Sequence, residues 1–108
     1  MPSKAMRHPD AAEALQIMGR PEPTTWIDLY KVYEVVREAQ GGEVGLIRSD
    51  LATKPDISAF TGSANLPSVS GEDARHARLA GTPKRTMQIA EARDFIGRLL
   101  TTWIDSLQ

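Results

Sequence analysis

Asn65, Arg75 and His76 are the residues of this sequence whose types could do chemistry together. They lie in FTGSANLPSVSGEDARHARLAG, residues 60–81, between two stretches with helical patterning. A histidine, with an ordinary pKa near ~6.5, is the side chain best suited to proton transfer at neutral pH. Neighbouring arginines would favour its neutral form, which can accept a proton, and could hold a phosphate by paired hydrogen bonds. The three residues together fit phosphodiester chemistry or nucleotide binding.

The same three side chains also fit a structural role. Asn65 at a helix end can adopt a left-handed conformation or hydrogen-bond the backbone of the following turn. Arg75 can form an ion pair with Glu72 or another carboxylate, and His76 can satisfy carbonyl groups of the loop. The residue types therefore leave open whether this segment is a site or a loop held in place by its own polar groups.

A basic stretch overlaps this segment. Residues 75–85, RHARLAGTPKR, contain Arg75, Arg78, Lys84 and Arg85 and no acidic residue, whereas residues 1–53 carry eight acids against six bases. These four cations, called the basic set below, are the first candidate for binding an anion or a nucleic acid; the alternative is a solvated loop. The lack of aromatic residues near them argues against recognition of single strands by base stacking.

Several other reaction chemistries lack their residues in this sequence. There is no cysteine, which excludes disulfides and thiolate catalysis. The two histidines, His8 and His76, are far apart in the chain, so the sequence predicts no metal site. Gly41-Gly42 matches neither a P-loop nor a G-x-G-x-x-G motif, and Gly62-Ser63 does not continue into G-x-S-x-G. We therefore expect no cofactor and favour a role without catalysis.

Length and composition predict a single domain. The chain has 108 residues, 41% of them hydrophobic and 25% charged, with a net charge of −1, which is ordinary for a globular domain. We expect residues 1–9 to form a flexible N-terminus and residues 10–108 to form one helical domain. No apolar run approaches the ~20 residues of a membrane span, and the N-terminus lacks the apolar core of a signal peptide. These features favour a cytoplasmic protein without membrane contact.

A short helix over residues 11–18, AAEALQIM, is predicted first. Asp10 and Glu13 match a capping box, and Gly19 lies where such a helix would end. We expect Leu15 and Met18 to make its apolar contacts.

Two longer helices form the centre of the predicted fold. The first spans about 25–40 from a cap at Thr24 or Thr25, and its apolar residues cover so wide an arc that we expect two packing neighbours. The second spans about 86–107 from a cap at Thr86, with a continuous apolar face in which Gly97 is expected to mark a close approach to another helix. The predicted fold class is therefore all-α: a small bundle of four to five helices, with shorter ones packed on these two.

The chain between the longer helices is predicted to be less regular. Residues 43–52 are expected to form a loop, because a lone strand would have no sheet to join. Thr53 is expected to cap a helix that reaches about Asn65. After a turn at LPSVS, the pattern of Ser70 and Asp73 is typical of the start of another short helix.

Three motifs resemble a recurring set of uncharacterised bacterial proteins. F-T-x-x-A-N spans residues 60–65, G-x-x-A-R-H-A spans residues 71–77 and M-x-x-A-E-A-R-x-x-I spans residues 87–96. Together with a pattern of four residues in the earlier helix, the resemblance covers about residues 25–107; these four are Trp26, Leu29, Tyr30 and Glu34. The resemblance implies a small helical protein and carries no activity with it.

The order of elements also resembles the HEPN superfamily, the higher eukaryote and prokaryote nucleotide-binding domains. These are small helical bundles, many of them dimers, in which a polar segment with an asparagine and a histidine precedes a long final helix. Some members are metal-independent ribonucleases of defence and toxin systems. Those members carry an arginine several residues before the histidine, but the corresponding positions here are Val69, Ser70 and Gly71. The resemblance therefore implies a binding or scaffold domain rather than an active nuclease.

These observations predict a non-catalytic helical interaction module that acts through protein contacts or self-association. The apolar arc of the helix at about 25–40, with two tryptophans in the chain, provides surface that can remain open to a partner. One alternative is a HEPN-like domain that binds RNA or nucleotides, with ribonuclease activity through Asn65, Arg75 and His76. A further alternative is an immunity or inhibitor protein, which the mildly acidic first half would suit.

Overall fold

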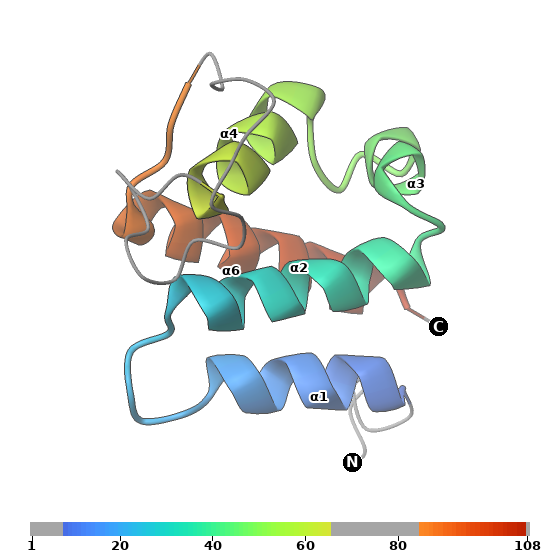
Figure 1. Cartoon of the computed structure of the whole chain (residues 1–108). Coiled ribbons are helices and arrows are strands. Elements are labelled where there is room, and N and C mark those ends of the chain that lie inside the picture. Colours follow the sequence, from blue (N-terminus) through green and yellow to red (C-terminus); the bar gives the residue numbers. More distant parts are fainter. Residues whose placement is uncertain (1–7, 66–84, 108) are drawn as a thin grey trace.

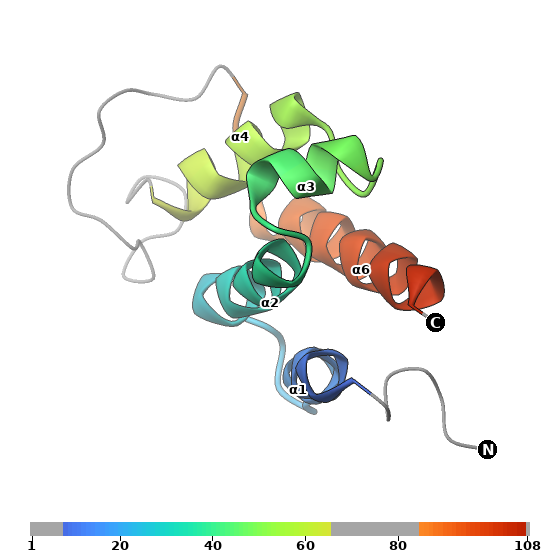
Figure 2. The same ribbon diagram turned by 90° about the vertical axis from the view of Figure 1, so that its right-hand side faces the viewer.

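The fold is all-α, as the sequence predicts. The computed structural model of the chain describes residues 8–65 and 85–107, and within these ranges it contains five helices and no strand. Figures 1 and 2 show α1 on one side of α2, with α6 beside α2 and with α3 and α4 on the side away from α1. The helices are α1 (Pro9–Met18), α2 (Trp26–Ala39), α3 (Glu43–Arg48), α4 (Lys54–Ala64) and α6 (Ile89–Ser106).

Helix α2 is the centre of the bundle. It begins with the capping box of Thr25 and Asp28, in which each side chain accepts a hydrogen bond from the other residue's backbone N–H. Its wide apolar arc contacts α1 on one side and both α4 and α6 on the other, which confirms the prediction of more than one packing neighbour. Val32 is fully buried, whereas Ile27, which extends the arc in the sequence, is 46% exposed.

The start of α1 differs from the prediction. The helix begins at Pro9, and the N-cap position is His8, without a side-chain hydrogen bond to the helix end. Asp10 lies inside the first turn and is not a cap, because proline at the first helical position already has the φ angle that a helix requires. The contact face differs in part. Met18 packs against the core as predicted, but Leu15 is 42% exposed. The buried positions are Ala11, Ala14 and Ile17, whose small alanines let α1 lie close to its neighbours.

Residues 43–48 form the short helix α3, so the prediction of a loop is wrong. Helix α2 ends in a Schellman motif: the N–H of Gly42 donates to the carbonyl of Arg37, and Gly41 has a φ of 84°. This turn reverses the chain and brings Leu46 into the core, where it is completely buried. The sequence does not reveal this helix because six residues are too few for a periodic pattern and because burial of one leucine stabilises it.

Helix α4 follows the prediction closely. Thr53 is its N-cap, and the Thr53 hydroxyl accepts a hydrogen bond from the N–H of Asp56. Pro55 lies in the first turn, where its missing N–H has no intrahelical partner to lose. The opposite end is Ala64, with Asn65 as the C-cap.

Helix α6 begins at Ile89, three residues later than the predicted cap at Thr86. The cause is a tertiary hydrogen bond: Met87 is buried, and its N–H donates to the Ser63 hydroxyl at 2.8 Å. This bond holds the residues before the helix in an extended conformation, as the ψ of 165° at Gln88 shows. The predicted apolar face of α6 is confirmed from Ala92 to Trp103, with Ala92, Phe95, Ile96, Leu99, Leu100 and Trp103 buried.

The core is built around one aromatic ring. The Phe60 ring centroid lies 5.4 Å from that of Tyr33, 5.6 Å from that of Phe95, 5.9 Å from that of Tyr30 and 6.0 Å from that of Trp26. These distances are in the range of favourable aromatic pairs. Helices α2, α4 and α6 are therefore joined by a single aromatic cluster.

One arginine ties α6 to the start of α2. Two N–H groups of Arg93, Nε and Nη2, donate to the carbonyl oxygen of the buried residue Thr24 at 3.1 and 2.8 Å. In the part of the chain that the structure describes, no helix has the length and apolar character needed to cross a bilayer. The predicted turn at LPSVS and the predicted helix from Ser70 lie outside the described residues.

Candidate functional site

The structure describes two of the residues that the sequence singles out for chemistry, Asn65 and Arg85. The remaining candidates, Arg75, His76, Arg78 and Lys84, lie outside the described residues.

Asn65 is the C-cap of α4 and has a right-handed conformation, with φ of −96° and ψ of −5°. The left-handed conformation considered for it is therefore not adopted. Its N–H donates to the carbonyl of Gly62 at 3.2 Å, as in a helix end. Its side-chain Oδ1 is buried and accepts no hydrogen bond from any described residue. Asn65 thus ends the helix, while its side chain has acceptor capacity left over.

Arg85 is held between two carboxylates. Its Nη2 is paired with the Asp56 carboxylate on α4, and its Nη1 donates to the Glu91 carboxylate on α6 at 2.7 Å. The guanidinium therefore joins the segment before α6 to the first turn of α4. A phosphate bound by Arg85 would have to compete with both carboxylates, so its local surroundings favour a structural role.

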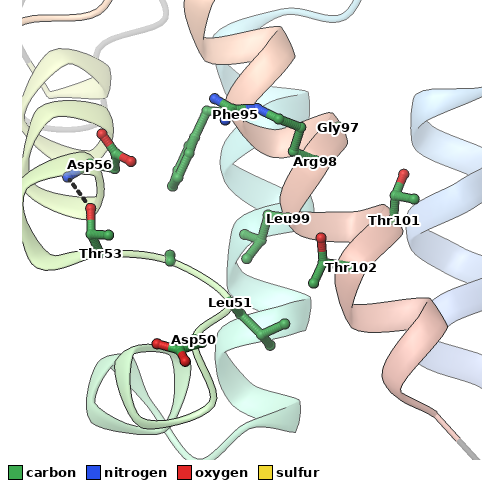
Figure 3. A pocket seen from close by; sticks show the side chains of 11 residues that line it. Asp50, Leu51, Thr53, Asp56, Phe95, Gly97, Arg98, Leu99, Thr101 and Thr102 are labelled. Carbon is green, nitrogen blue, oxygen red and sulfur yellow. Dashed lines mark hydrogen bonds between the residues drawn. The ribbon is translucent and has the colours of Figure 1, made fainter.

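A groove lies between the α3–α4 connection and one face of α6. Its volume is about 450 Å³. Figure 3 shows its two walls: residues 50–56 form one, and the α6 residues from Phe95 to Thr102 form the other. The groove residues are Asp50, Leu51, Ala52, Thr53, Asp56, Phe95, Gly97, Arg98, Leu99, Thr101 and Thr102.

The floor of the groove is apolar and its ends carry opposite charges. Leu51, Phe95 and Leu99 lie between the two ends in Figure 3, with Arg98 at one end and Asp50 at the other. Arg98 is exposed; its Nε donates to the backbone carbonyl of Asp94 at 3.4 Å, and it forms no ion pair with a described residue. Both charges are therefore available to a molecule that covers the floor.

Gly97 contributes open space to this groove. A Cβ built on Gly97 would meet no heavy atom within 4 Å, so the close helix approach expected there is absent. Because Gly97 has no side chain, the groove is wider at this position of α6 than it would be with a larger residue.

The backbone at Asp50 is unusual. Asp50 has a φ of 58°, in the left-handed region that glycine adopts most easily. It is the residue that ends α3 in a second Schellman motif: its N–H donates to the carbonyl of Ile47 at 3.1 Å, and the N–H of Leu51 donates to the carbonyl of Leu46 at 3.0 Å. In the corresponding position at the end of α2 the chain has Gly41.

Among the described residues, the titratable group with the largest change in pKa lies in the core, away from the groove. Tyr33 is 1% exposed, and burial raises its pKa from 10.0 to about 12, while the positive charge of Arg37 acts in the opposite direction. The Arg37 guanidinium lies 5.5 Å from the centroid of the Tyr33 ring. At neutral pH the Tyr33 hydroxyl is therefore a neutral part of the core. Among the described residues, no cluster of three or more His, Cys, Asp and Glu side chains is arranged to hold a metal ion.

Comparison with protein-family models, with curated proteins and with solved structures finds no match to this chain.

The groove could not be predicted from the sequence, because each of its residues taken alone has an ordinary explanation. The sequence pattern predicts a solvent-exposed face of the last helix for Arg98, Thr101 and Thr102, and a loop for Asp50. One signal was present: a glycine within an otherwise regular helix, which usually has a packing or functional reason. Here Gly97 marks open space rather than a close contact.

Proposed function

We propose that this chain is a non-catalytic helical interaction module of the bacterial cytoplasm, and that it binds a protein partner through the groove. The observation that carries the proposal is the groove between Arg98 and Asp50, whose apolar floor consists of the partly buried Leu51 and the buried Phe95 and Leu99. Protein interfaces have this arrangement, with an apolar centre and a polar rim.

Two apolar side chains of α3, the helix that precedes the groove residues in the chain, are also exposed. Val44 is 64% exposed and Ile47 is 37% exposed, one turn apart on the helix that leads directly into the groove at Asp50. Single exposed apolar residues are common, but two that lie one turn apart on a short helix offer a partner apolar area in addition to the groove. A protein partner fits the groove and this additional area better than a small molecule, which would occupy the groove alone.

Site-specific photo-crosslinking in the cells of origin tests the proposal. A benzoyl-phenylalanine at Thr102, in the groove, should give covalent adducts with protein after irradiation. The same probe at Glu13, an exposed position of α1 outside the groove, should give few. A Thr102 probe that yields no more protein adduct than the Glu13 probe would contradict the proposed function.

The crosslinked product also decides between this role and the alternatives. The HEPN-like role of RNA or nucleotide binding depends on Arg75, His76 and the rest of the basic set, and adducts with nucleic acid would favour it. The pairing of Arg85 with Asp56 and Glu91 speaks against Arg85 as a phosphate ligand. A single adduct with one unrelated protein would fit an immunity or inhibitor role.

A further inference from the structure

Building on the proposed function, we propose that the partner in the groove is a second copy of this chain, bound through its own groove by a two-fold axis. In such an interface both copies use the same surface. A residue at one end of the groove in one copy therefore faces a residue at the opposite end of the groove in the second copy. The inference therefore depends on whether the groove is complementary to its own rotated image.

The charges of the groove meet this condition. Arg98 lies at one end of the apolar floor and Asp50 at the other (Figure 3). A two-fold rotation about an axis through the floor exchanges the ends, so that Arg98 of each copy faces Asp50 of the other. The third charged residue of the groove, Asp56, is already paired with Arg85 and does not compete for Arg98.

Neither Arg98 nor Asp50 has an ion-pair partner among the residues that the structure describes. Two ion pairs would therefore form across the interface without breaking any pair within the described parts of each chain. A binding site for a simple anion or cation would carry one sign of charge, whereas the two charges of this groove without an ion pair among the described residues, Arg98 and Asp50, have opposite signs. Opposite charges at opposite ends are what a self-complementary surface needs.

The backbone at Asp50 supports a functional use of its carboxylate. A left-handed conformation costs a residue with a side chain about 1 kcal/mol relative to glycine, although aspartate tolerates it better than most. The chain places glycine at the corresponding position after α2 but aspartate after α3, at the rim of the groove. Strained residues of this kind are concentrated at functional sites.

The apolar surface supplies the centre of the same interface. Phe95 and Leu99 are already buried in each copy, at 4% and 1% exposed, so the apolar contact across the axis would come from the partly buried Leu51. The space above Gly97 leaves room for side chains of the second copy. Burial of this surface contributes the affinity, while the Arg98–Asp50 pairs fix the orientation of the copies.

Complementary charge reversal tests the proposal. Arg98→Glu places two acids opposite each other at both ends of the interface, and Asp50→Lys places two bases there. Sedimentation equilibrium should show wild-type dimers and, for each variant alone, a dimer dissociation constant raised by about tenfold or more. An equimolar mixture of the two variants should restore the wild-type constant. In the mixed dimer, one end pairs the introduced acid with the introduced base, and the other end keeps the native pair of Arg98 and Asp50.

Two further variants serve as controls. Lys31→Glu makes the same change of charge on the exposed face of α2, outside the groove, and should leave the dissociation constant unchanged. Asp50→Asn removes the charge but keeps a side chain that tolerates the left-handed conformation. It should weaken the dimer without lowering the thermal midpoint of the monomer, which separates loss of the ion pair from loss of the fold.

Two results would overturn the inference. One is a wild-type chain that stays monomeric at millimolar concentration; the other is a mixture of variants that associates no better than either variant alone. If the Thr102 photoprobe still gives adducts with another protein in that case, the chain is an interaction module with a different partner. If the probe gives no adducts at all, the proposed function fails as well.

Discussion

Tyr33 combines near-complete burial with an ionisable hydroxyl, and this makes the stability of the protein depend on alkaline pH. Burial raises its pKa to about 12, against 10.0 when exposed. Below pH 10 the folded and unfolded chains both keep the proton. Between pH 10 and 12 the unfolded chain loses it and the folded chain retains it, so ionisation favours unfolding as the pH rises.

We therefore expect the free energy of unfolding to fall by up to about 1.4 kcal/mol per pH unit over this window because of Tyr33 alone. Urea unfolding at pH 9, 10, 11 and 11.5 measures the slope. Tyr33→Phe is the control. Titration of the lysines and of the other tyrosine changes the stability of wild type and variant alike, so the difference in slope between them comes from Tyr33. The interpretation fails if both proteins lose stability with the same slope.

At the scale of the elements, the two glycines inside helices α3 and α6 have opposite structural reasons. A Cβ on Gly45 in α3 would lie 1.8 Å from the backbone carbonyl oxygen of Gln40, so the end of α2 and the start of α3 can approach only if this residue is glycine. A Cβ on Gly97 in α6 would touch nothing within 4 Å. The same substitution should therefore change the stability of the protein in opposite directions.

We expect Gly97→Ala to stabilise the fold by up to about 1 kcal/mol, because alanine restricts the unfolded chain and favours the helix at no steric cost. Gly45→Ala should destabilise it by at least about 1–3 kcal/mol, because backbone must move to admit the methyl group. Each 1 kcal/mol shifts the thermal midpoint by roughly 4–8 °C in a domain of this size. Midpoints measured at low protein concentration, with each variant beside wild type, test both signs; a Gly97→Ala protein less stable than wild type would contradict the open space at that position.

At the scale of the whole molecule, helices α2, α4 and α6 share one aromatic cluster, and the groove lies beside it, with Phe95 belonging to both. A second copy bound at this groove would stabilise the folded chain by mass action, because only folded chains present the surface. Folding and association would then be linked.

This linkage predicts that the thermal midpoint of the wild-type chain rises with protein concentration. Above the dimer dissociation constant, each tenfold increase should raise the midpoint by roughly 3–5 °C. Arg98→Glu should show a midpoint that is almost independent of concentration over the same range. Scanning calorimetry from micromolar to millimolar concentration distinguishes these outcomes, and equal concentration dependence of both proteins would argue against association through the groove.

The sequence by itself determined the helical class and the elements whose signals are local. Thr25 and Thr53 predicted the starts of α2 and α4, because a cap acts on backbone groups within three residues of it. The apolar spacing of α6 likewise predicted its buried face from Ala92 to Trp103. Periodicity and capping succeed because they depend on neighbours along the chain.

Only the tertiary structure decided the rest, because it depends on residues distant in sequence. The Ser63 hydroxyl, 24 positions before Met87, delays the start of α6. Burial of Leu46 makes a helix of residues that look like a loop, and Asp56 pairs with Arg85 across 29 positions. The groove arises in the same way: Asp50 and Arg98 come from opposite halves of the chain, and the packing of α3 and α4 beside α6 places them at the two ends of one apolar floor.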